Sequence, residues 1–108
     1  MNKELLKGST ETLILSLLSN EPMYGYGLIK KLNVISDGVF KLKEGTLYPI
    51  LHSLEKKKLV EAYWEKKENS RKRKYYKITK KGQKELSSKE KEWNTFSKTV
   101  NKVLREGM

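Results

Sequence analysis

Residues 44–59 read EGTLYPILHSLEKKKL, and their apolar side chains recur with the period of an α-helix. The apolar positions fall at i, i+3, i+4 and i+7 along one side and are Leu47, Ile50, Leu51 and Leu54. The opposite side carries small residues, hydrogen-bonding side chains and a cation: Gly45, Pro49, His52, Ser53 and Lys56, with Tyr48 on its flank. Such a helix can bury one side and place the other in the major groove of DNA, which is typical of a recognition helix.

The positive charge of the chain is concentrated around this helix. The 108 residues carry a net charge of +11, and residues 41–84, with 15 Lys or Arg and 5 Asp or Glu, account for +10 of it. A central block of cations favours binding to a polyanion, because each neutralised phosphate releases condensed counterions. A general bias towards lysine is the alternative explanation, but such a bias would also raise the charge of both ends of the chain.

The composition argues against several other classes of protein. There is no cysteine, so neither a disulfide framework nor a thiolate metal site is expected, and a cytoplasmic setting fits. No run approaches 18 apolar residues and the N-terminus lacks the apolar segment of a secretory signal, so we expect no membrane span. His52 is the single histidine, and no carboxylates are paired in an apolar setting. We therefore predict no enzyme, no metal site and no cofactor.

Two helices and a short extended piece are predicted before the recognition-type helix. Apolar periodicity indicates helices over residues 4–19 and about 24–35, and residues 39–42 are expected to be extended. The third helix should start between residues 43 and 46. Thr46 would be a good N-cap that places Pro49 in the first turn, whereas an earlier start would put Pro49 inside the helix and bend it.

After Leu59 the hydrophobic period changes to two, which predicts a β-hairpin. Val60, Ala62 and Trp64 form the first alternating run, and residues 74–79 form the second. Cations at the tip and on the second strand can contact DNA phosphates or enter a minor groove. Alternatively, they only keep an exposed strand edge soluble. The cations concerned are Lys66, Lys67, Arg71, Lys72, Arg73 and Lys74.

A long final helix follows, capped by Thr79 and extending to about residue 105. Leu86, Trp93 and Val100 repeat every seven residues, and the intermediate position holds Phe96 and Val103 but is interrupted at Lys89. A seam of this kind on an otherwise charged helix needs a second surface to cover it. We predict dimerisation through Leu86, Trp93, Phe96, Val100, Val103 and Leu104.

The order of these elements predicts the fold class. It is α+β and mainly helical: a winged helix–turn–helix DNA-binding domain over residues 1–79, followed by a C-terminal dimerisation helix over residues 80–108. Candidate DNA contacts on the third helix are Thr46, Tyr48, His52, Ser53 and Lys56. Those on the hairpin are Lys66, Lys67, Arg71, Lys72 and Arg73. Tyr48, on the flank of its helix, is equally compatible with packing against the hairpin.

Three blocks of the sequence resemble the PadR family of bacterial transcriptional regulators. They are residues 22–26 (PMYGY), 44–49 (EGTLYP) and 71–82 (RKRKYYKITKKG), in the family's order and spacing. The single C-terminal helix is similar to the smaller PadR-like subfamily. The chain departs from the family at Gly27, Lys58 and Lys89, where relatives tend to carry an acidic residue, a glycine and a small residue.

The resemblance implies a homodimeric repressor of a pseudo-palindromic operator in double-stranded DNA. Several members of the subfamily respond to planar aromatic or cationic small molecules, which lie between two symmetry-related tryptophans at the dimer centre. The corresponding candidate effector residues here are Trp93, Phe96, Leu5, Gly8 and Thr12. Trp93 is equally suited to dimer packing. A sequence-tolerant nucleic-acid-binding or architectural protein is the alternative function.

Overall fold

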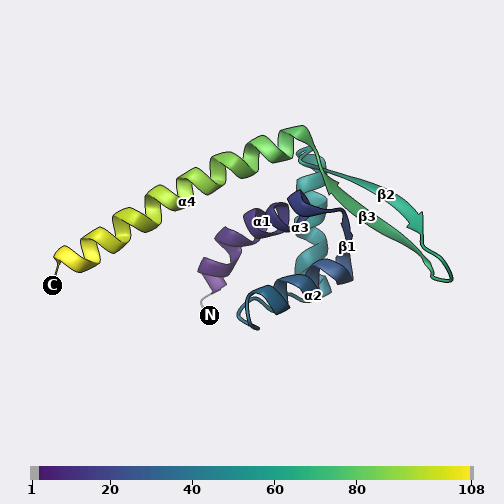
Figure 1. The fold of residues 1–108 in the computed structure, drawn as a ribbon, viewed down its shortest axis with the longest axis horizontal. Coiled ribbons are helices and arrows are strands. Elements are labelled where there is room, and N and C mark those ends of the chain that lie inside the picture. The colour runs from purple at the N-terminus through teal and green to yellow at the C-terminus, as the bar shows by residue number, and fades with distance from the viewer. Residues whose placement is uncertain (1–2, 108) are drawn as a thin grey trace.

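The described part of the chain, residues 3–107 with side chains from residue 9 onward, forms four helices and a three-stranded sheet in a computed structural model. The elements are, in order, α1 (Lys3–Asn20), β1 (Met23–Tyr24), α2 (Gly25–Ile35), α3 (Glu44–Lys56), β2 (Val60–Lys66), β3 (Lys72–Ile78) and α4 (Lys80–Glu106). The β2–β3 hairpin and α4 project in opposite directions from the three shorter helices (Figure 1). This arrangement confirms the predicted winged helix–turn–helix with a long C-terminal helix.

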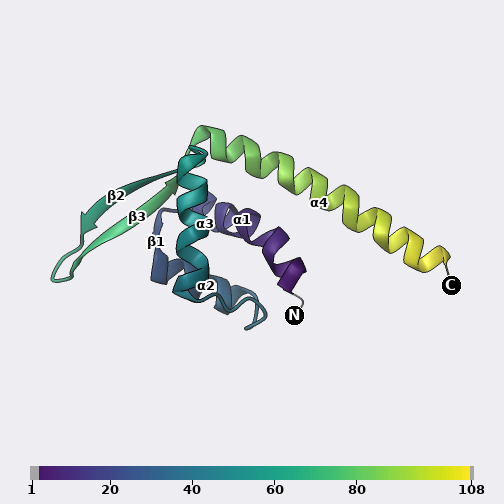
Figure 2. The ribbon, with the colours of Figure 1, turned by 180° about the vertical axis from the view of Figure 1, so that it is seen from behind.

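The hydrophobic core lies where α1, α2 and α3 meet the base of the hairpin. Its most deeply buried side chains include Ile14, Leu28, Leu47, Leu51, Leu54 and Val60. The apolar side predicted for residues 44–59 is therefore the buried side of α3, with Ile50 at the edge of the core. Burial of this side leaves the opposite side of α3 exposed (Figure 2, where α3 is in front).

The sheet has the strand order β1-β3-β2, and both pairs are antiparallel. β2 and β3 pair from Val60 opposite Ile78 to Lys66 opposite Lys72, which confirms the predicted hairpin. The third strand is β1, which the sequence did not predict because two residues are too few to show alternation. Residues 39–42, expected to be extended, lie in a loop that joins no strand of this sheet.

The start of α3 settles the alternative that the sequence left open. The helix begins at Glu44, with Lys43 as N-cap, because the carbonyl oxygen of Lys43 accepts bonds of 3.0 Å from the N–H groups of both Thr46 and Leu47. Thr46 is therefore inside the first turn rather than the N-cap, and Pro49 is inside the helix. Glu44 places a carboxylate in the first turn, where the helix dipole favours negative charge.

The end of α3 is a Schellman motif with an unusual residue in its left-handed position. The N–H of Leu59 donates to the carbonyl of Leu54 (2.9 Å) and the N–H of Lys58 to that of Glu55 (3.0 Å), which is the pair of bonds that defines the motif. Lys58 has a φ of 63°, in the region that usually requires glycine. Lys58 therefore occupies a strained backbone position.

The beginning of α4 is fastened to the core. The side-chain oxygen of Thr79 accepts a 3.0 Å bond from the N–H of Gly82, which confirms the predicted N-cap. The same hydroxyl donates to the carbonyl of Lys58 at 2.8 Å. Gly82 is buried against the carbonyl of Leu59, and Leu86 is only 7% exposed. The first two turns of α4 thus pack on the winged core.

The remainder of α4 extends into solvent and gives the molecule its elongated shape. The principal extents are 59 × 29 × 21 Å and the radius of gyration is 15.8 Å. A compact domain of this length has a radius of gyration of about 13 Å. We refer to residues 89–106 of this helix as the arm.

Candidate nucleic-acid interface

The exposed side of α3 presents a narrow strip of small and polar residues. Gly45, Pro49, His52 and Lys56 are all exposed and lie along the side opposite the buried leucines. Thr46 is also exposed, on the edge of this strip. The strip offers hydrogen-bonding groups and a cation to a ligand outside the helix. Its small residues at the first turns allow a close approach.

Tyr48 lies on one flank of this strip and packs against the start of α2. Its hydroxyl would be 2.5 Å from a Cβ added at Gly25, so the absence of a side chain at that glycine makes room for the tyrosine. Tyr48 is still 45% exposed. Tyr48 is therefore packed against the start of α2 at its hydroxyl end and partly open to solvent.

Ser53 lies on the other flank and turns towards α1. Its hydroxyl donates to Glu11 Oε1 at 3.5 Å, and Lys57 Nζ lies 3.4 Å from both oxygens of the same carboxylate. The helical period placed Ser53 with the candidate DNA contacts, but the structure half-buries it at the contact between α1 and α3. Sequence reasoning missed Glu11, because nothing in its local pattern indicates a partner 42 residues away.

The hairpin ends in a tight cationic tip. The N–H of Ser70 donates to the carbonyl of Lys67 at 2.9 Å, and Asn69 adopts a φ of 58° to make the turn. The predicted contacts in this region are all exposed: Lys66, Lys67, Arg71, Lys72 and Arg73. They do not, however, share one face of the hairpin, because successive residues of a strand point to opposite sides.

We name the two faces of the hairpin by what lies at their base. The core-side face starts with Val60, Ala62, Tyr76 and Ile78, which pack on the core or at its edge. Along the same face, towards the tip, follow Trp64, Lys66, Lys72 and Lys74. The outer face carries Glu61, Tyr63, Glu65, Arg73, Tyr75 and Lys77.

An aromatic cluster fills the outer face and engages its cations. Tyr75 stacks on Tyr63, with ring centroids 5.8 Å apart, and meets the Tyr24 ring edge-on at 5.6 Å. The guanidinium of Arg73 lies 4.5 Å from the Tyr24 ring and the ammonium of Lys67 lies 5.3 Å from the Tyr75 ring. Lys77 pairs with Glu61 at 3.7 Å. Cations over aromatic rings are attracted by the ring quadrupole, so this face has its own internal partners.

α3 packs against the core-side face of the hairpin. Burial raises the pKa of the Tyr76 hydroxyl, and the Glu55 carboxylate and Tyr48, both on α3, raise it further. Burial also raises the pKa of Tyr63 on the outer face, with Glu65 adding to the effect. Both tyrosines are therefore neutral at physiological pH.

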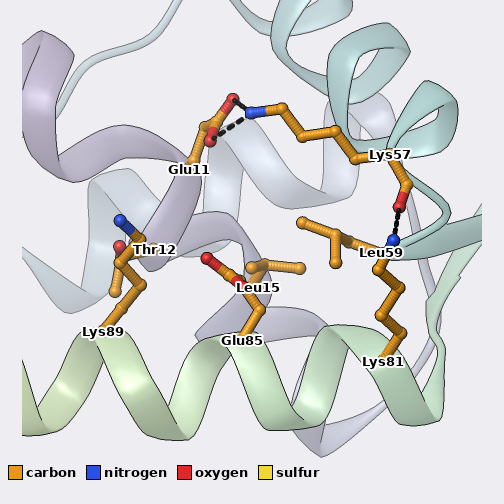
Figure 3. A pocket seen from close by; sticks show the side chains of 8 residues that line it. All are labelled: Glu11, Thr12, Leu15, Lys57, Leu59, Lys81, Glu85 and Lys89. Atoms are coloured by element: carbon orange, nitrogen blue, oxygen red, sulfur yellow. Dashed lines mark hydrogen bonds and ion pairs between the residues drawn. The ribbon is translucent and has the colours of Figure 1, made fainter.

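A cleft of about 350 Å³ separates α1 from the beginning of α4 (Figure 3). Its polar walls include Glu11, Thr12, Glu85 and Lys89, and the Lys81 ammonium donates to the carbonyl of Lys57 at 3.0 Å. Among the predicted effector residues with described side chains, only Thr12 lines this cleft. Leu5 and Gly8 lie in the part of α1 for which the structure describes the backbone alone.

The arm exposes the apolar seam that the heptad pattern predicted. Trp93 (57% exposed), Phe96, Val100, Val103 and Leu104 are open to solvent, and the rings of Trp93 and Phe96 lie 6.1 Å apart. Leu86, by contrast, is buried in the core of its own chain. The uncovered part of the seam therefore begins at Trp93.

No group of three His, Cys, Asp or Glu side chains in residues 3–107 is arranged to hold a metal ion. Over the same part of the chain, no helix is long and apolar enough to cross a membrane.

Comparison with known proteins gives consistent matches along the chain. Residues 14–88 match the family model described as the transcriptional regulator PadR-like family. An uncharacterised protein from Lysinibacillus sphaericus is 32% identical over 108 residues, covering 100% of this chain and 98% of that protein. A PadR-like transcriptional regulator from Bacillus cereus is 39% identical with a TM-score of 0.84, over 94% of this chain and 97% of that one. A transcriptional regulator from Clostridium thermocellum is 33% identical with a TM-score of 0.86, over 94% and 96% of the two chains.

Proposed function

The chain belongs to the PadR-like family of transcriptional regulators. From this we propose that it is a cytoplasmic, homodimeric repressor that binds a pseudo-palindromic operator in double-stranded DNA. α3 of each protomer lies in a major groove, and each hairpin contacts the flanking backbone or minor groove. The half-sites lie about one helical turn apart, as in other dimers that use a recognition helix.

The observation that carries this proposal is the exposed strip of α3 beside a cationic hairpin. His52 and Lys56 can donate to bases or phosphates, and Thr46 and Tyr48 border the same strip. Base edges supply sequence discrimination, whereas cations on phosphates supply affinity and position. Ser53, bonded to Glu11, supports the orientation of α3 rather than reading bases.

A second copy of the chain is the partner that suits the arm. The accessible surface is 8315 Å², whereas a compact monomer of this mass exposes about 6,200 Å². The excess of about 2,000 Å² lies in the range that one protomer contributes to an obligate homodimer interface. The seam residues Trp93, Phe96, Val100, Val103 and Leu104 would be covered in such a dimer.

The proposed effector binds at the start of the arm. Trp93 and Phe96 form an exposed aromatic pair near the start of the arm, suited to a planar aromatic or cationic molecule. Lys89, one turn earlier, lines the cleft of Figure 3 and pairs with the Glu92 carboxylate at 3.8 Å. In a Trp64→Phe variant, Trp93 is the only tryptophan. Its emission should change on addition of planar ligands at about 1 mM, and unchanged emission would remove the effector from the proposal.

The proposed function is tested on the DNA upstream of the protein's own coding region. We expect an inverted repeat there to be protected in a footprint and to compete at least a hundredfold better than a random duplex at about 150 mM salt. Equal competition by random duplex would favour the sequence-tolerant nucleic-acid binder, for which the central block of +10 is the supporting observation. Absence of binding to either duplex would contradict both functions.

A further inference from the structure

The two faces of the hairpin differ in charge, and this difference indicates which face meets DNA. On the core-side face, the half nearer the tip carries Trp64 and three lysines. None of the side chains that β2 and β3 place on this half is acidic. On the outer face, Glu61 and Glu65 lie opposite Lys77 and Arg73, so the strand charges cancel. A polyanion is attracted to the first face and nearly indifferent to the second.

The position of α3 supports the same conclusion. α3 packs on the core-side face, because its buried leucines share the hydrophobic core with Val60 and Tyr76 of the hairpin, so this face looks towards the side of the molecule that holds the recognition helix. The half of the hairpin nearer its tip extends beyond α3 (Figures 1 and 2). DNA seated on α3 would therefore have its flanking backbone beside this half.

Trp64 is the unexpected member of this surface. It lies directly opposite Lys74 and one alternation from Lys66, and it is 60% exposed although it is the largest side chain of the hairpin. None of the ring contacts found among the described residues involves it. A large apolar ring open to water between cations gains free energy when it is covered, and the sugar rings that line a DNA groove offer an apolar cover between phosphates.

Resting on the proposed function, we propose that the hairpin contacts DNA with its core-side face, where Trp64 packs on deoxyribose in the flanking minor groove while Lys66 and Lys72 contact phosphates. The ammonium of Lys74 lies 5.6 Å from the Tyr76 ring and adds its charge to the same face. Arg73 and Lys67, which the sequence placed among the DNA contacts, instead stabilise the aromatic cluster of the outer face. Trp64 is thus an additional DNA contact, and it senses the shape of the minor groove rather than the identity of a base.

Two adjacent residues of β3 provide a matched test. Lys72 and Arg73 carry the same charge and are both exposed, but they point to opposite faces. The probe is a labelled duplex of about 30 base pairs from the upstream region, long enough for two half-sites. We expect Lys72→Ala to raise the dissociation constant roughly fivefold to tenfold and to lower the salt slope by about one. Arg73→Ala should change the dissociation constant by less than about twofold.

Trp64 supplies an independent measurement. In a Trp93→Phe variant it is the only tryptophan, so its emission reports on the hairpin alone. We expect the duplex to shift this emission and to protect it from iodide quenching. Trp64→Ala should raise the dissociation constant about tenfold without lowering thermal stability, because its ring is largely exposed.

The outcomes separate this inference from the function on which it depends. A wild-type protein that binds no duplex overturns both. If the wild-type protein binds, Arg73→Ala lowers the affinity, Lys72→Ala does not and the Trp64 emission is unchanged, the assignment of the face is wrong. The repressor function is then still supported.

Discussion

The winged core and the arm of α4 differ in whether their apolar side chains are buried within the chain. In the core, Leu47, Leu51 and Leu54 on one helix are completely buried by other elements of the same chain. In the arm, Trp93 and Phe96 remain more than half exposed. The core is therefore complete within one chain, whereas the apolar side of the arm is left exposed by the described residues of its own chain.

This difference separates two kinds of stability. Burial within a chain stabilises the fold at any protein concentration, whereas burial between chains stabilises it by mass action. The two regions meet at Gly82 and Thr79, so substitutions at the junction, in the core and in the arm should have distinguishable effects.

The largest effect is expected at the junction. Gly82→Ala places a Cβ against the carbonyl oxygen of Leu59 and 2.7 Å from Ile78 Cγ1, and the backbone cannot yield without disrupting the end of α3. The free energy of unfolding in urea should fall by more than about 4 kcal/mol. Gly45→Ala is the control, because a Cβ there meets no heavy atom within 4 Å among the described residues and should raise stability slightly. Similar stability of the two variants would show that the junction is not tight.

In the core, Leu51→Ala should lower the free energy of unfolding by about 3 kcal/mol, because its side chain is completely buried. The loss should be the same at low and high protein concentration. Leu104→Ala makes the same chemical change in the arm, where the side chain is exposed. Its loss should appear only at concentrations at which chains associate, and a concentration-independent loss would contradict the contrast between core and arm.

In the arm, Phe96→Glu should weaken dimerisation about a hundredfold, because it places a charge in the seam, a loss of about 2.7 kcal/mol in association free energy. Sedimentation equilibrium measures this directly. Asn94→Glu introduces the same charge at an exposed position away from the seam and should leave the dimer intact. Equal dissociation of both variants would indicate a general charge effect instead of a seam.

The smallest effect is expected at Lys58. Lys58→Gly removes the strain of a non-glycine residue with a φ of 63°. It also makes the unfolded chain more flexible, so the free energy of unfolding should rise by only about 0.5 kcal/mol. Lys57→Gly is the matched control, because Lys57 has a φ of −76° and an ion pair with Glu11. It should lower stability by a similar amount. Equal losses in both variants would show that the left-handed position carries no strain.

The sequence predicted what depends on local rules. The Thr79 cap, the alternation of the hairpin and the seam from Trp93 all follow from neighbouring residues, and the structure confirms the cap and the hairpin. It did not predict β1 or the position of Ser53, and it left the start of α3 open between residues 43 and 46. These depend on β3, on Glu11 and on the carbonyl of Lys43, and the first two of these partners are distant in the chain. The faces of the hairpin were implicit in the period of two, but only the packing of α3 distinguishes them.

The tight contact between Gly82 and the Leu59 carbonyl also has a mechanical consequence. A helix of 27 residues is a lever of roughly 40 Å. A rotation of about 5° at its fastened end would displace the other end by roughly 3.5 Å, about the rise of one base pair. If the start of α4 could rotate by this amount, the distance between two recognition helices would vary by about the rise of one base pair. The close packing of Gly82 on the Leu59 carbonyl limits such rotation, so in the proposed dimer the spacing is determined by how the two arms pack on each other.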